Sequence, residues 1–405
     1  MNVTDKLFLR ILKAALEGES YTEPQEIDAD QWNEIFRMAQ DHKVLPLIYQ
    51  AAYGVMNPEV RERIRGSVRK TVMLQAIKTH EFLQLNEKLR EAGCEPIVVK
   101  GIVCRSLYPQ PDLRPSSDED ILIPEAQFAD CCRVLRRFGM DTDTPEDKWP
   151  QTFEVPFRKK DSPLFLEVHK SLFSPQSEAY GHWNGFFENA RERAVRQADV
   201  LTLSDTDHLF YLLCHAFKHF IHSGFGIRQV CDIILYANAR GHLVDWQQVY
   251  ENCCRIQGEV FAAALFRIGE RYLNFDPAKA QYPALWQEIS VDEGDMLQDL
   301  LSAGVYGSAN MSRLHSSGLT LEAVSANRNG KKENGLKKAL LPSAESLSGR
   351  YPYLEKRPWL LPVAWSGRIL SYLRETRQTR DNSAVQSLQI GNQRVELLKK
   401  YRVIR

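Results

Sequence analysis

The most informative stretch of the chain is residues 97–123, IVVKGIVCRSLYPQPDLRPSSDEDILI. It opens on a short β-branched run that Lys100 and Gly101 follow, and it closes on a second apolar run that Pro124 ends. Runs of β-branched residues bounded by glycine and proline are typical of strands. We therefore expect a strand over 96–100, a short helix over 102–108 and a second strand over 118–123.

The residues that follow continue the alternation of helix and strand. A helical pattern over 125–138 ends at Gly139, and two strand-like runs follow at 153–158 and 164–169. The segment between these runs, 159–163, contains Lys, Asp, Ser and Pro and is suited to a hairpin loop. This order predicts a small core with a mixed sheet.

The rest of the chain reads differently. Residues 1–92 have helical spacing of apolar residues, and residues 179–322 are again mostly helical. Residues 323–350 are rich in Ser, Asn, Gly and Lys, which predicts a flexible linker, and 351–405 form an aromatic and basic helical segment. We therefore expect an α+β fold in which a core at 93–178 is embedded in helical regions.

Composition narrows the class of protein. The chain has 405 residues, 43% of them hydrophobic, and its 52 basic and 52 acidic residues cancel. This balance is typical of soluble globular proteins and lacks the basic excess of proteins that coat duplex nucleic acid. No apolar run is long enough to cross a membrane, and the N-terminus resembles an amphipathic helix rather than a signal peptide. The eight cysteines form no C-x-x-C, so we expect buried, reduced thiols in a cytoplasmic protein.

Three carboxylates are candidates for chemistry. Asp118 and Asp120 are two residues apart on a predicted strand, so both side chains lie on one face. Glu167 interrupts an apolar run in the second half of the predicted hairpin. If that hairpin pairs beside the strand of Asp118 and Asp120, Glu167 completes a three-carboxylate cluster. Such a cluster can hold two Mg²⁺ or Mn²⁺ ions for phosphoryl transfer. Two structural interpretations stay open: a solvated strand edge for the aspartates, and a salt bridge of Glu167 with Arg158 or Lys160.

The residues before the aspartates are of types that commonly bind phosphate groups. Gly101, directly after a strand, allows backbone N–H groups at a helix start to face an anion. Positive charge and hydroxyl groups capable of binding a nucleotide come from Lys100, Arg105, Arg114, Ser116 and Ser117.

Histidines follow on a later helix. His215 and His219 are i,i+4 neighbours, and Lys218 lies between them. They are interpreted either as lining a nucleotide cleft or as a core helix with satisfied imidazoles, and a zinc site lacks a third ligand. His169 shares a strand face with Glu167 and is a further contact for substrate.

The order of strand, glycine, short helix, D-x-D strand and later acid resembles the nucleotidyltransferase superfamily typified by DNA polymerase β. More narrowly, the chain is similar to a bacterial family of uncharacterised nucleotidyltransferases, through VVKG at 98–101, LRPSSDEDILI at 113–123 and LEVH at 166–169. The resemblance implies that Asp118, Asp120 and Glu167 are the metal ligands and that Gly101 opens the helix. The superfamily usually has Gly-Gly or Gly-Ser where this chain has Gly101-Ile102.

This resemblance implies an enzyme that moves a nucleoside monophosphate from a nucleoside triphosphate, such as ATP, to an acceptor with the help of two Mg²⁺ or Mn²⁺ ions. The acceptor can be a small molecule, an RNA end or a protein hydroxyl. The alternatives are a D-x-D glycosyltransferase that uses a nucleotide-sugar, and a non-catalytic protein that binds a nucleotide or a partner on the same scaffold. Because clustered carboxylates repel one another without metal, replacing Asp118 or Asp120 by Asn is expected to leave the fold intact or slightly more stable.

Overall fold

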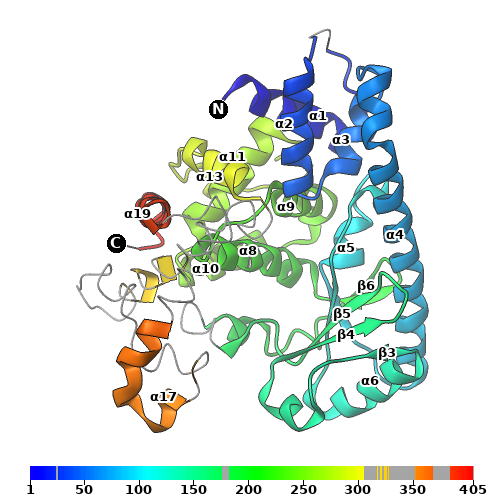
Figure 1. Ribbon diagram of the computed structural model, residues 1–405, viewed down its shortest axis with the longest axis vertical. Helices are drawn as coiled ribbons and strands as arrows, with labels where there is room; N and C mark the ends of the chain where they lie inside the picture. Colours follow the sequence, from blue (N-terminus) through cyan, green and yellow to red (C-terminus); the bar gives the residue numbers. More distant parts are fainter. Residues whose placement is uncertain are drawn as a thin grey trace.

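The secondary-structure elements described before the first strand are all helices, as the sequence predicts. The computed structural model describes residues 1–404 except 24–25, 176–181, 305–316, 318–319, 322, 326, 328–350, 352 and 368–383. The opening helices are α1 (Val3–Glu17), α2 (Ala29–Asp41), α3 (Leu45–Ala52) and α4 (Pro58–Glu91). Asn2 and Asp28 start α1 and α2 with capping boxes, and Gly93, with a φ of +76°, follows the end of α4. In Figure 1, α4 runs from the first three helices down one side of the molecule to the sheet.

The centre of the fold is a seven-stranded mixed sheet with the strand order β3-β4-β5-β2-β1-β7-β6. The strands are β1 (Ile97–Val99), β2 (Glu119–Leu122), β3 (Met140–Asp141), β4 (Glu154–Lys159), β5 (Phe165–His169), β6 (Val195–Gln197) and β7 (Val200–Thr202). β4 and β5 form the predicted antiparallel hairpin, and β5 pairs in parallel with β2. The expected α+β fold with a mixed sheet is confirmed.

Two details differ from the prediction. β2 begins at Glu119, so Asp118 lies just before the strand, because pairing with β5 starts at Glu119 and pairing with β1 reaches only Asp120. The sheet also extends beyond the expected core at 93–178, because β6 and β7 add to it next to β1. Their two-residue turn, Ala198-Asp199, has positive φ at both positions but lacks the Asn-Gly signature that announces such turns.

Helices complete the fold around the sheet. Short helix α5 (Gly101–Arg105) follows β1, and α6 (Glu125–Arg137) follows β2. The second helical region contains α8 (Asp205–Ile221), α9 (Ile227–Arg240), α10 (Trp246–Arg255), α11 (Glu259–Tyr272), α12 (Ala284–Gln287) and α13 (Gly294–Ala303), and α17 (Tyr353–Lys356) and α19 (Ala384–Lys400) come last. Short 3-10 turns lie at Pro111–Leu113, Glu146–Gln151, Trp183–Phe187, Gly241–Leu243 and Pro358–Leu360. The predicted linker, 323–350, lies almost entirely outside the described residues.

The cysteines and the membrane prediction can be compared with this fold. All eight cysteines are free, and seven are buried as expected, whereas Cys254 is exposed. Among the helices that the structure describes, none combines the length and apolar character needed to cross a bilayer.

One buried carboxylate ties α5 to β2. Glu119 is fully buried and accepts hydrogen bonds from the backbone N–H of Ile102, from Arg105 and from the Ser116 hydroxyl. Gly101 has a φ of +25°, and a Cβ atom added there would lie 1.9 Å from Glu119 Oε2. Glycine is therefore needed at this position because the Glu119 carboxylate fills the space that a side chain would take.

We expect Gly101→Ala to lower the free energy of unfolding by about 1–3 kcal/mol, because the added methyl must displace Glu119 from its partners. Urea unfolding followed by circular dichroism measures the change. Gly66→Ala is the matched control, since a Cβ atom on Gly66 in α4 meets nothing within 4 Å and alanine favours a helix by about 0.5–1 kcal/mol. Equal stabilities of Gly101→Ala and the wild type would contradict this account.

Candidate active site

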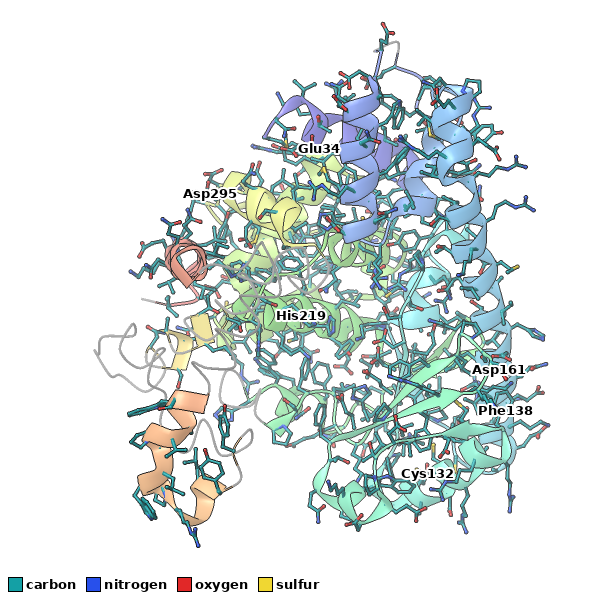
Figure 2. The ribbon with its side chains drawn as sticks, viewed as in Figure 1. Glu34, Cys132, Phe138, Asp161, His219 and Asp295 are labelled. Carbon is teal, nitrogen blue, oxygen red and sulfur yellow. The ribbon has the colours of Figure 1, made fainter. Side chains whose placement is uncertain are left out.

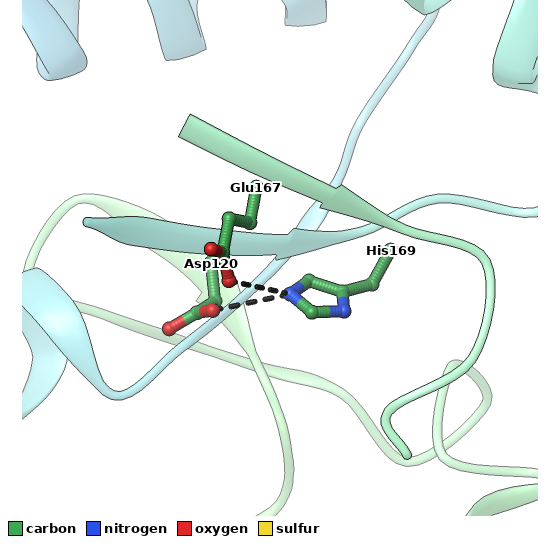
Figure 3. Close-up of side chains that lie close together, drawn as sticks. All are labelled: Asp120, Glu167 and His169. Atoms are coloured by element: carbon green, nitrogen blue, oxygen red, sulfur yellow. Dashed lines mark hydrogen bonds and ion pairs between the residues drawn. The ribbon is translucent and has the colours of Figure 1, made fainter. Parts of the chain in front are cut away.

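Two of the three candidate acids meet through strand pairing. Asp120 of β2 is the register partner of Glu167 of β5, so their side chains lie side by side on one face of the sheet. His169, two residues further along β5, lies on the same face. Carboxylate oxygens of the two acids and a ring nitrogen of His169 all lie within 4.8 Å of one another. Figure 3 shows the three side chains pointing toward one another. The predicted pairing of the hairpin beside the Asp118–Asp120 segment is therefore confirmed.

His169 joins the acids. Its Nε2 atom lies 3.1 Å from Asp120 Oδ1 and 3.7 Å from Glu167 Oε2, and its Nδ1 atom lies 3.4 Å from Glu154 Oε2. Burial alone would lower the pKa of His169, but the hydrogen bonds and charges of these carboxylates outweigh it and raise the pKa to about 9. The imidazole is therefore cationic at neutral pH and balances part of the acidic charge.

Lys100 is the second cation among the acids. Its Nζ atom lies 2.9 Å from Asp120 Oδ2 and 3.2 Å from His215 Nε2. The backbone of Lys100 has φ 55° and ψ −113°, a conformation that L-residues rarely adopt. Such strain persists only where surrounding contacts hold it, and it is concentrated at functional sites. The turn into α5 thus places the ammonium group of Lys100 at Asp120.

The two aspartates have opposite electrostatic environments. Burial raises the pKa of Asp118, and repulsion from Asp120 raises it further. Burial also acts to raise the pKa of Asp120, but attraction to Lys100 and the hydrogen bond from His169 outweigh burial and hold that pKa well below its usual range. Asp120 is therefore the paired carboxylate, and Asp118 is the one that lacks full compensation of its charge.

The histidine helix faces this site. His215 lines a cleft that is open to solvent, together with Lys100, Asp118 and Asp120. His219, labelled on α8 in Figure 2, follows it, with its Nε2 atom 3.3 Å from His215 Nε2. Burial, reinforced by nearby lysine charges, holds the pKa of both rings well below the usual value, so both are neutral. In the described part of the chain these two rings belong to no cluster of three metal-ligating side chains.

Lys218 sits between these histidines and is half-buried. Burial lowers its pKa, as does the charge of Lys100, while the charges of Glu154, Asp120 and Glu167 act in the opposite direction. Lys218 is therefore close enough to Glu154, Asp120 and Glu167 for their charges to interact.

The predicted phosphate ligands are engaged within the protein. Arg105 is buried and donates to Glu119 Oε1 at 2.7 Å, and Ser116 donates to the same atom at 3.1 Å. Arg114 forms a two-pronged ion pair with Asp232 at 2.6 and 2.7 Å. Gly101 opens α5 as expected, yet the N–H of Ile102 at this helix start donates to Glu119.

Ser117 is exposed and accepts a hydrogen bond from Lys43 Nζ at 3.1 Å. Nothing in the structure tests whether Arg105, Arg114, Ser116 or Ser117 also contacts a nucleotide, so that role stays a prediction.

Several residues of the cleft were not identified from the sequence. Arg228 and Gln229, in the first turn of α9, line the cleft beside Gly101, Arg114 and Ser116, and Asp232 of the next turn lines it too. No motif marks Arg228 and Gln229, because only the packing of α9 against α5 and the preceding loop brings them there. Asp232 belongs to the stretches that resemble the family, but it was not predicted as a site residue. The polar character of Arg228 and Gln229 within an otherwise apolar helix is the one signal of them that the sequence contained.

The opposite pKa shifts predict opposite effects of two similar substitutions on stability without metal. Asp118→Asn should raise the free energy of unfolding by roughly 1 kcal/mol, because an ionised acid with a raised pKa opposes folding. Asp120→Asn should lower it by about 2–4 kcal/mol, because the substitution removes the carboxylate that pairs with Lys100 and His169. Denaturant unfolding at pH 7 in EDTA measures both values. The sequence alone predicts an intact or slightly stabilised fold for both variants, whereas these contacts predict that outcome for Asp118→Asn alone. A stabilised Asp120→Asn would contradict the second prediction.

Comparison with known proteins gives one match. No curated protein and no solved structure matches the chain significantly. A family model described as uncharacterised nucleotidyltransferase matches residues 28–274, which include the acidic cluster, the strained turn at Lys100 and the helices α8 and α9 that close the cleft. The chain therefore belongs to this uncharacterised nucleotidyltransferase family.

Proposed function

We propose that the protein is a metal-dependent enzyme that transfers a nucleoside monophosphate from a nucleoside triphosphate to an acceptor hydroxyl. The observation that carries this proposal is the pairing of Asp120 with Glu167 on neighbouring parallel strands, beside His169, in a member of a nucleotidyltransferase family. Carboxylates side by side on one face of a sheet, next to a cleft, are the arrangement that this chemistry needs.

The acidic cluster suits a divalent cation. Asp120 and Glu167 each offer a carboxylate oxygen, and Asp118 adds a carboxylate in the cleft that Asp120 also lines. The His169 ring nitrogen lies within 4.8 Å of the first two, and it becomes a ligand atom only when the imidazole loses its proton. Oxygen-rich sets of this kind favour Mg²⁺ or Mn²⁺. Bound there, such ions would neutralise negative charge on the phosphates and favour ionisation of the acceptor hydroxyl.

The protein's own groups have separable roles in this proposal. Glu167, whose side chain is 26% exposed, is accessible to accept the proton of the acceptor hydroxyl. The acceptor oxygen then bonds to the α-phosphorus, the bond from that phosphorus to the bridging oxygen breaks, and pyrophosphate leaves. Lys100 is positioned to offset charge on the phosphates, and cationic His169 holds Asp120 and Glu167 in place.

The acceptor and the base of the nucleotide are not specified by these contacts. Family membership favours nucleotidyl transfer over the glycosyltransferase alternative. The non-catalytic alternative, in which the same scaffold only binds a nucleotide or partner, is an outcome of the experiment that follows.

Wild-type protein incubated with each labelled nucleoside triphosphate, Mg²⁺ or Mn²⁺ and a cell extract should transfer the label to an acceptor. Asp118→Asn, Asp120→Asn and Glu167→Gln should each reduce transfer by at least about 100-fold, because each removes a carboxylate that would hold the divalent cations, whose positive charge stabilises the transferring phosphoryl group. The matched control is Asp161→Asn, a substitution of an exposed aspartate in the β4–β5 turn at the outer edge of the molecule (Figure 2). Transfer that survives all three substitutions, or no transfer with any nucleotide, would reject the enzymatic proposal.

Metal with nucleotide should raise the melting temperature of the wild type, because a ligand at 100 times its Kd stabilises the folded state by about 2.7 kcal/mol. Glu167→Gln should lose most of this rise, since it removes one carboxylate of the cluster without breaking the closer Asp120–Lys100 pair. Differential scanning fluorimetry with and without EDTA measures the shift, and Asp161→Asn should behave as wild type. An unchanged shift in Glu167→Gln would show that this carboxylate does not ligate the metal.

A further inference from the structure

The first turn of α9 contributes two polar side chains to the cleft. Arg228 is 6% exposed and Gln229 is 8% exposed, and both line the cleft that contains Asp118 and Asp120. α9 has 14 residues, so the positive end of its dipole lies at this turn. Buried polar groups therefore converge on the cleft from the side opposite the sheet.

These side chains have hydrogen-bonding capacity that the protein does not use. Among the residues that the structure describes, no hydrogen-bond partner is found for the side-chain oxygen and nitrogen of Gln229 or for the Nε atom of Arg228. Buried polar atoms in native proteins are nearly always satisfied, and each exception requires an explanation. In a cleft beside an acidic cluster, a bound ligand is the explanation that accounts for both residues together.

Other groups suited to phosphate are already taken. The N–H at the start of α5 and the guanidinium of Arg105 are bound to Glu119, and Arg114 is paired with Asp232. The backbone N–H groups of a glycine turn at a helix start commonly bind phosphate. In this protein the N–H of Ile102 instead donates to the Glu119 carboxylate. The positive charge needed for a polyphosphate must then come largely from elsewhere in the cleft.

Arg228 and Lys43 supply such charge next to Asp118. Arg228 lies close enough to Asp118 and to Lys43 for its charge to act on both. Arg228 donates to the carbonyl of Pro115, and exposed Lys43 donates to Ser117 Oγ at 3.1 Å. Both cations thus bind the loop that leads into Asp118, Arg228 from the cleft and Lys43 from the exposed surface.

We propose that Arg228, Gln229 and Lys43 form the subsite for the β- and γ-phosphates of the nucleoside triphosphate, the part that leaves as pyrophosphate. This inference rests on the proposed function. Arg228 and Lys43 provide charge-assisted hydrogen bonds, and the amide N–H groups of Gln229 donate to a phosphate oxygen. The subsite directs the polyphosphate toward α9 and leaves the α-phosphate at Asp118, Asp120 and Glu167.

The test measures binding of inorganic pyrophosphate to the full-length protein by isothermal titration calorimetry, in EDTA and again in Mg²⁺. Arg228→Gln, Gln229→Leu and Lys43→Gln should each weaken binding by about tenfold or more, because each removes a donor to an anion. Arg228→Lys should recover part of the loss by keeping the charge. Asp118→Asn should strengthen binding in EDTA by removing a repelling charge. The matched control is Arg63→Gln, which removes an exposed positive charge of α4 that does not line the cleft.

The outcomes separate this subsite from the proposed function. Circular dichroism and the melting temperature verify folding, and exposed Lys43 keeps the test decisive if Arg228→Gln fails to fold. No pyrophosphate binding in either buffer, or unchanged affinity in Gln229→Leu and Lys43→Gln, overturns the subsite even when label transfer is found. Affinity that falls in these variants but not in Arg63→Gln supports the subsite even when no transfer is found.

Discussion

The buried carboxylate of Glu119 is the contact on which the site depends. It lies on β2 between Asp118 and Asp120, and successive residues of a strand point to opposite faces. While Asp120 faces β5 and the cleft, Glu119 therefore faces α5, where it binds the start of the helix and Arg105. This arrangement joins the D-x-D strand to the glycine turn as one unit. A charge buried this deeply is tolerated only because several donors satisfy it.

The same requirement explains the charges around the acids. Asp120 is nearly inaccessible to solvent, and without bound cations its charge must be balanced from within the protein. Lys100 and cationic His169 provide that balance at 2.9 and 3.1 Å. Asp118 lies just before β2, and its negative charge is less fully balanced by nearby cations. A bound cation would therefore stabilise the Asp118 carboxylate most. The protein thus stabilises the acidic cluster in advance while leaving part of it for a ligand.

The site belongs to two layers of the structure. The sheet supplies Asp120, Glu167 and His169, whereas α8 and α9 supply His215, Arg228 and their neighbours from the facing helical layer. In Figure 1, α8 and α9 lie beside the sheet rather than apart from it. The helical region after the core is therefore part of the functional unit, in agreement with a family match that extends from α2 to the end of α11. The packing between these layers brings the acidic side chains of the sheet and the polar side chains of α8 and α9 to one cleft.

The sequence by itself determined the local elements and the face on which the acids lie. Strong β-branched runs, the hairpin loop and the period of two in strands were sufficient to predict the strands that carry Asp120 and Glu167, because these signals depend on near neighbours in the chain. The pairing of those two strands came from the tertiary structure. The sequence missed the β6–β7 hairpin, whose Ala198-Asp199 turn adopts its positive φ angles without glycine. Only the tertiary structure decided which cations are already paired and which groups reach the cleft. Arg114 and Asp232 are far apart in sequence, as are Lys100 and His215, and such pairings arise from the packing of whole helices that no local pattern encodes.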